Sequence, residues 1–85
     1  MTREEILARL KSSILEELYL EDIDENDLTD ATPLFGEGLG LDSIDAVELV
    51  VVIEKHFGVT IKDAEEAKAA FLNLGVLADF IISRR

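Results

Sequence analysis

Cysteine is absent from this 85-residue sequence, and histidine occurs only once. Without cysteine the chain has no disulfide bond, no thiolate metal site and no thiol nucleophile, so its stability has to come from packing. The apolar content of 48% is sufficient for one compact core, and we expect a single domain over residues 1–85. The chain offers no convincing catalytic constellation, and we expect no enzymatic activity of its own.

Long hydrophobic runs are also missing. The longest aliphatic run of the central segment is Leu49 to Ile53, whereas a helix that spans a bilayer needs roughly 20 apolar residues. The N-terminal sequence MTREEILARL introduces acidic residues at once and lacks the apolar region of a signal peptide. We therefore expect a cytoplasmic protein that does not associate with membranes.

Basic residues are scarce and unevenly placed. The sequence has 8 Lys and Arg against 19 Asp and Glu, which gives a net charge of −11. No basic residue occurs between Lys11 and Lys55, although acidic residues run through that whole interval. Such a surface repels nucleic acid and attracts basic protein surfaces. A merely solubilising acidic face is the alternative interpretation.

Proline and glycine concentrate in one stretch. The only proline, Pro33, lies between residues 20 and 41, in a polar connection whose length is unusual for so small a domain and typical of a functional loop. Three of the five glycines of the sequence occupy alternate positions there: Gly36, Gly38 and Gly40. We expect three apolar side chains to anchor this connection to the core: Leu28, Leu34 and Phe35.

The first helix is predicted by a capping box and an apolar repeat. Thr2 and Glu5 have the spacing of a capping box, in which each side chain bonds the backbone of the other residue. Apolar residues then recur every four positions, at Ile6, Leu10, Ile14 and Leu18. We expect an amphipathic helix that ends near Tyr19.

The second helix is predicted to begin at Asp42 or Ser43. Its aliphatic middle is also compatible with a buried strand, but acidic residues in the first turn suit the helix dipole, and Gly58 provides a stop. We expect an inward stripe made of Ala46, Val50, Ile53 and Phe57. A different face carries Ile44, Glu48, Val51 and Lys55.

The rest of the chain predicts two further helices. Asp63, with Glu66 three residues later, begins a short helix that ends at about Ala70, and a last helix runs from about Leu74 to Ser83. The expected fold is a small all-α bundle of three longer helices plus one short helix, with a long first loop.

Two ligand-binding interpretations of the loop fail on spacing. A dinucleotide-binding loop requires G-x-G-x-x-G after a strand, which the glycines here do not provide, and Glu37 stands where a phosphate would bind. Asp22, Asp24 and Asn26 begin like a calcium loop. However, position 6 is Asp27 instead of glycine, and position 12 is Pro33 instead of glutamate. We expect no dedicated metal site.

A third interpretation is that Ser43 is modified. Ser and Asp at a helix start usually serve only as caps. Here one residue of the pair is enough, so Asp42 can cap while Ser43 points outward, and the preceding glycines leave space for an approaching enzyme. A phosphodiester on Ser43 would be an anion at a helix N-terminus, where backbone N–H groups and the helix dipole favour it.

The segment LDSIDAVEL, residues 41–49, resembles the attachment motif of acyl carrier proteins, roughly D-S-L/I-x-x-x-E-L. The resemblance implies that a phosphopantetheinyl transferase attaches 4′-phosphopantetheine from coenzyme A to Ser43. It also implies that the arm carries acyl groups as thioesters to acyl-transferring and condensing enzymes with basic docking surfaces. The carrier itself is expected to be a monomer. The implied partner-recognition positions are Asp42, Ile44, Glu48, Val51 and Glu54, and we add Asp45 from the same first turn.

The departures from the family pattern concern the pathway. Lys55-His56 stands where carriers of primary fatty acid synthesis usually continue the acidic face, and Ile61-Lys62 replaces a common Ile-Pro. A specialised lipid or polyketide pathway therefore fits at least as well as fatty acid synthesis. A D-alanyl or other aminoacyl carrier and an unmodified acidic interaction module stay open as alternatives. His56 is interpreted as a helix-terminal residue that meets the dipole, not as a catalytic one.

Overall fold

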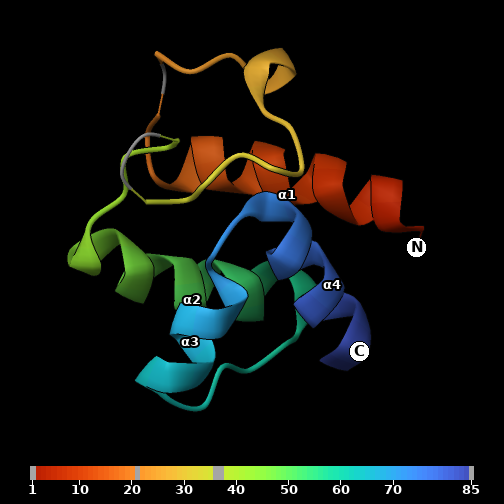
Figure 1. Cartoon of the computed structure of the whole chain (residues 1–85), viewed down its shortest axis with the longest axis vertical. Coiled ribbons are helices and arrows are strands. Elements are labelled where there is room, and N and C mark those ends of the chain that lie inside the picture. The colour runs from red at the N-terminus through yellow and green to blue at the C-terminus, as the bar shows by residue number, and fades with distance from the viewer. Residues whose placement is uncertain (1, 21, 36–37, 85) are drawn as a thin grey trace.

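A computed structural model of the chain describes residues 2–20, 22–35 and 38–84. It contains four α-helices, with a short 3₁₀ helix, η1, in the first loop (Figure 1). Their bounds are α1 Arg3–Glu17, η1 Glu25–Asp27, α2 Ser43–Phe57, α3 Ala64–Ala70 and α4 Leu74–Arg84. The described residues form no β-strand beyond two isolated bridges. The predicted all-α bundle, with one short helix and a long first loop, is confirmed. The predicted roles of Gly36 and Glu37 lie outside the described residues.

Helix α1 begins as its sequence predicts. The hydroxyl of Thr2 accepts a hydrogen bond from the Glu5 backbone N–H, and the Glu5 carboxylate accepts one from the Thr2 N–H, each at 3.1 Å. This reciprocal cap satisfies two N–H groups that have no partner inside the helix. The predicted apolar stripe is buried: Ile6, Leu10, Ile14 and Leu18.

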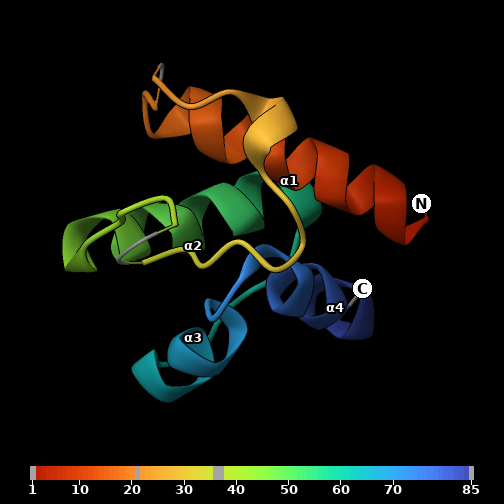
Figure 2. The same cartoon turned by 45° about the horizontal axis from the view of Figure 1, so that its top comes forward.

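Helix α1 packs along α2 and α4, while the short α3 lies beside α2 and α4 on the side away from α1 (Figures 1 and 2). The side chains between these helices form one apolar core. Burying this core is the main source of stability for a chain of this size, because cross-links are absent. None of the helices in the described ranges combines the length and the apolar character that crossing a bilayer requires.

The second half of the first loop packs against the core and is hydrogen-bonded to the start of α4. Its predicted anchors Leu28 and Leu34 are buried and Phe35 is half-buried; Leu39 and Leu41 are buried as well. The carbonyl of Asp30 accepts a hydrogen bond from the N–H of Gly75 at 2.7 Å, at the start of α4. A Cβ atom on Gly75 would lie 2.9 Å from that carbonyl oxygen, so the close approach requires glycine.

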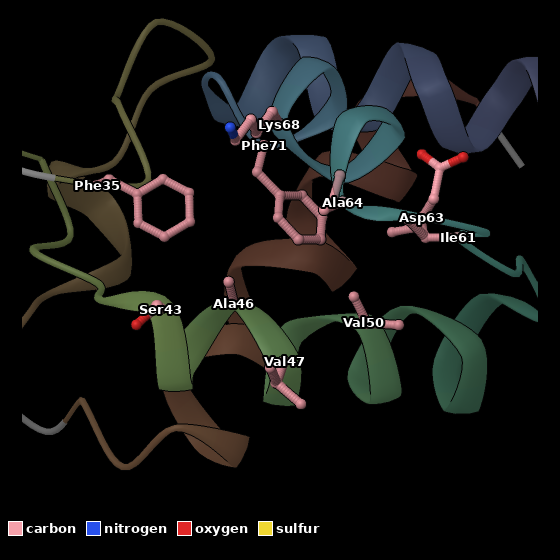
Figure 3. Close-up of a pocket in the computed structure, with 11 residues that line it drawn as sticks. Phe35, Ser43, Ala46, Val47, Val50, Ile61, Asp63, Ala64, Lys68 and Phe71 are labelled. Atoms are coloured by element: carbon pink, nitrogen blue, oxygen red, sulfur yellow. The ribbon is translucent and has the colours of Figure 1, made fainter.

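The four residues predicted for the inward stripe of α2 all contact the core, but only two of them are buried. Ile53 and Phe57 are buried as expected, but the other core residues of α2 are Leu49 and Val52. Ala46 and Val50 are half-buried: they pack against the core and also line the cavity between α2 and α3 (Figure 3). The middle of α2 is aliphatic around most of its circumference, so its periodicity does not distinguish the two buried sides. The opposite face is exposed as predicted: Ile44, Glu48, Val51 and Lys55.

Candidate functional site

The start of α2 is capped by Asp42. One carboxylate oxygen of Asp42 accepts hydrogen bonds from the N–H groups of Ile44 and Asp45, both at 3.0 Å. In return, the Asp45 carboxylate accepts a hydrogen bond from the Asp42 N–H at 3.2 Å, which completes a capping box. Asp42 therefore caps α2 without a contribution from the Ser43 side chain. Asp45, a predicted partner-recognition residue, is half-buried, and its carboxylate completes the capping box.

The cap leaves the Ser43 hydroxyl uncommitted. Ser43 is the first residue of α2 and is exposed, and no hydrogen bond of its hydroxyl is found among the described residues. Figure 3 shows the hydroxyl at one end of a cavity, directed outward. A serine in this position contributes little to the helix start, so its oxygen is available for chemistry.

The structure explains why two positions of the first loop, 38 and 40, are occupied by glycine. Gly40 has φ 69°, a left-handed conformation that side chains other than glycine rarely adopt. A Cβ atom on Gly38 would lie 1.8 Å from the Pro33 carbonyl oxygen. That oxygen also accepts a hydrogen bond from the Leu39 N–H at 3.0 Å. These glycines fold the loop tightly back on itself immediately before Ser43.

A cavity of about 370 Å³ opens beside Ser43, between α2, α3 and the first loop (Figure 3). Its lining is almost entirely apolar. Helices α2 and α3 contribute small and aliphatic side chains, namely Ala46, Val47, Val50, Ala64 and Ala67. Phe35, Ile61 and Phe71 complete the apolar wall. The sequence leads us to expect room for an acyl chain between helices, but it gives neither the size nor the lining of this cavity. The alanines of α2 and α3 are a signal that two helices leave space where they face each other.

The outward face of α2 combines aliphatic side chains with carboxylates. Ile44 is 70% exposed and Val51 is 60% exposed, and the neighbouring Glu48 and Glu54 are exposed as well. The structure adds Val47, which is 67% exposed and which sequence reasoning did not assign to this face. Large exposed aliphatic side chains gathered on one helix face are typical of a protein interaction site.

The basic end of α2 is paired with α1. The Glu17 carboxylate lies 3.2 Å from the Lys55 ammonium and 3.3 Å from Nε2 of His56. Hydrogen bonding from Lys55, then from His56, together with the positive charge of Lys55, lowers the pKa of Glu17 below its ordinary value. His56 therefore has a specific partner on another helix, in addition to its predicted place at the helix C-terminus.

The acidic stretch of the loop is used for local structure. One carboxylate oxygen of Asp24 accepts a hydrogen bond from the Asn26 N–H at 2.9 Å and caps η1. In the described ranges, no group of three or more His, Asp and Glu side chains is placed to hold a metal ion.

The fold and the site together define a class of protein, a small acidic helical bundle that presents an exposed serine at a helix start beside an apolar cavity. A family model described as "Phosphopantetheine attachment site" matches residues 8–81. The chain is 42% identical over 67 residues to an acyl carrier protein of Thermotoga maritima, covering 79% of this chain and 78% of that protein. It is 37% identical over 84 residues to an acyl carrier protein of Cyanidium caldarium, covering 99% and 91%.

A solved structure agrees with these relatives. The acyl carrier protein of Enterococcus faecalis superimposes with a TM-score of 0.74 at 32% identity, and the match covers 100% of both chains. This chain belongs to the acyl carrier protein family, whose members carry an attachment site for phosphopantetheine. The resemblance noted in the sequence is thereby confirmed.

Proposed function

We propose that Ser43 is the attachment site and that the chain carries acyl intermediates in fatty acid, specialised lipid or polyketide biosynthesis. The observation that carries this proposal is that Asp42, and not Ser43, caps the start of α2. Asp42 accepts from both exposed N–H groups, so the adjacent Ser43 hydroxyl stays exposed and uncommitted. The dipole of the 15-residue helix favours a phosphodiester at that position.

The apolar cavity supports an acyl cargo. When bound, the 4′-phosphopantetheine arm supplies a terminal thiol that holds an acyl group as a thioester. The cavity beside Ser43 measures about 370 Å³, is partly open to solvent and is lined almost entirely by apolar side chains. A hydrocarbon chain gains free energy by leaving water for such a lining, whereas a small polar aminoacyl group gains little. The cavity therefore favours an acyl carrier over a D-alanyl carrier.

The partners follow from the outward face of α2. Asp42, Glu48 and Glu54 provide negative charge around the exposed Ile44 and Val51. A phosphopantetheinyl transferase and the acyl-transferring and condensing enzymes would meet this face with basic, partly apolar surfaces. The chain would act as a monomer that presents its cargo to each enzyme in turn.

The test is the intact mass after incubation with coenzyme A and a broad-specificity phosphopantetheinyl transferase. We expect the parent chain and the control Ser12→Ala, an exposed serine of α1, to gain one phosphopantetheine group. Ser43→Ala should gain none while keeping the helical circular dichroism of the parent, because Asp42 still caps α2. A loaded Ser43→Ala variant would refute Ser43 as the site. A folded parent that gains nothing would instead support the unmodified interaction module.

A further inference from the structure

One positively charged side chain, that of Lys68, lines the mostly apolar cavity beside Ser43. Among the described lining residues, only Asp63 and Lys68 are ionisable. The Asp63 carboxylate is already engaged, because it caps α3 by accepting a hydrogen bond from the Glu66 N–H at 2.8 Å. Lys68 belongs to the last turn of α3, and none of the ion pairs found between described residues involves it.

The two ionisable residues lie at opposite ends of the cavity. Figure 3 draws Lys68 toward the end of the cavity that holds Ser43 and Phe35. Asp63 and Ile61 are at the other end (Figure 3). The cation is therefore on the side of the cavity where an arm attached to Ser43 begins.

The helix start favours an anion on Ser43, but the ionisable side chains next to it in the sequence are acidic. Asp42 and Asp45 flank it, and the whole chain carries a net charge of −11. Lys68 is the positive side chain that shares a cavity lining with Ser43. Because Lys68 is exposed, an ion pair that it forms there contributes modestly and is screened by salt.

We propose that Lys68 is a positioning residue that binds an anionic group of the arm and so holds the arm against the cavity. This inference rests on the proposed attachment to Ser43. The phosphodiester is one source of the anion and is present in every loaded form; a carboxylate on a short acyl group is the other. A partner enzyme whose basic surface meets the outward face of α2 would compete with Lys68 for the phosphodiester and release the arm.

The test compares thermal unfolding before and after loading, in low salt, for the parent and two variants. Lys68→Gln removes the cation, and Lys62→Gln is the matched control, an exposed lysine that does not line the cavity. Each chain is loaded from coenzyme A, butyryl-coenzyme A or succinyl-coenzyme A, and its mass is checked. The ³¹P resonance of each loaded chain is recorded as a readout that a merely structural role of Lys68 would not move.

We expect loading to raise Tm by about 2–4 °C less in Lys68→Gln than in the parent or the control, as for one exposed ion pair. The deficit should shrink in 1 M NaCl. A deficit in all three loaded forms, with a shifted ³¹P resonance, assigns Lys68 to the phosphodiester; a deficit in the succinyl form alone assigns it to the acyl carboxylate. Equal Tm changes in all three chains would overturn the inference while leaving Ser43 as the site. Failure of every chain to load would overturn both.

Discussion

The carboxylate of Glu17, at the end of α1, accepts a hydrogen bond from the ammonium of Lys55, 38 residues later in the last turn of α2, at 3.2 Å. The same oxygen lies 3.3 Å from Nε2 of His56. Lys55 and His56, in the last turn of α2, thus connect this helix to the end of α1. The departure from the acidic pattern of the family at Lys55-His56 therefore has a structural role within this chain.

The contact of Glu17 with Lys55 and His56 predicts that the stability of the fold depends on pH. Because the folded state lowers the pKa of Glu17 below its ordinary value of 4.5, ionised Glu17 stabilises the fold above that value. The contribution is lost as the pH falls through the lowered pKa. Glu17→Gln should therefore lower Tm at pH 7, and its difference from the parent should shrink as the pH falls below 4.5 and through the lowered pKa.

The matched control is Glu16→Gln, an exposed neighbour for which no ion pair is found among the described residues. The pKa of Glu5 is also lowered, by hydrogen bonds from Thr2, but this effect is the same in the parent and both variants. The comparison of Tm against pH consequently isolates Glu17. A Glu17→Gln deficit that stays unchanged as the pH falls through the lowered pKa of Glu17 would show that the side chain acts through packing and not through its charge.

Tyr19 carries backbone strain at the end of α1. Its φ is 55°, in the left-handed region, while the Leu20 N–H donates to the Leu15 carbonyl at 2.9 Å. This arrangement is a Schellman motif, in which glycine usually occupies the place of Tyr19. The Tyr19 side chain is 83% exposed, so it gains little from burial in return for the strain.

We predict that Tyr19→Gly stabilises the chain by about 0.5–1 kcal/mol, because glycine adopts this conformation without a Cβ clash. Urea unfolding followed by circular dichroism measures the difference. Tyr19→Ala is the control that removes the ring and keeps the Cβ atom. An alanine variant as stable as the glycine variant would attribute the effect to the ring.

The elements that the sequence predicts correctly depend on neighbouring residues. Thr2 and Glu5 close a capping box within three residues, and Asp42 and Asp63 cap their helices over the same short distance. Gly58 ends α2 with φ 68°. Such contacts are determined by the local chain, so their residue types and spacing are enough to place the helix ends.

The features that the sequence does not predict depend on how distant elements meet. The sequence predicts Val50 in the core, whereas in the structure it is half-buried and also lines the cavity between α2 and α3. The partnership of Glu17 with Lys55 joins two helix ends that only the tertiary fold brings together. The cavity likewise depends on the distance between α2 and α3, which the apolar periodicity of a single helix does not predict.

The last prediction concerns the outward face of α2. Glu48 lies between the exposed Ile44 and Val51, where a basic partner would approach. Reversing one charge in such a surface mainly slows association, so Glu48→Lys should reduce the rate of loading by a phosphopantetheinyl transferase by about tenfold in low salt. Glu65→Lys, which reverses an exposed charge on α3, should have a much smaller effect. The difference between the two variants should narrow as salt screens the attraction. Equal loading rates for both variants at every salt concentration would show that enzymes do not approach the carrier over this face.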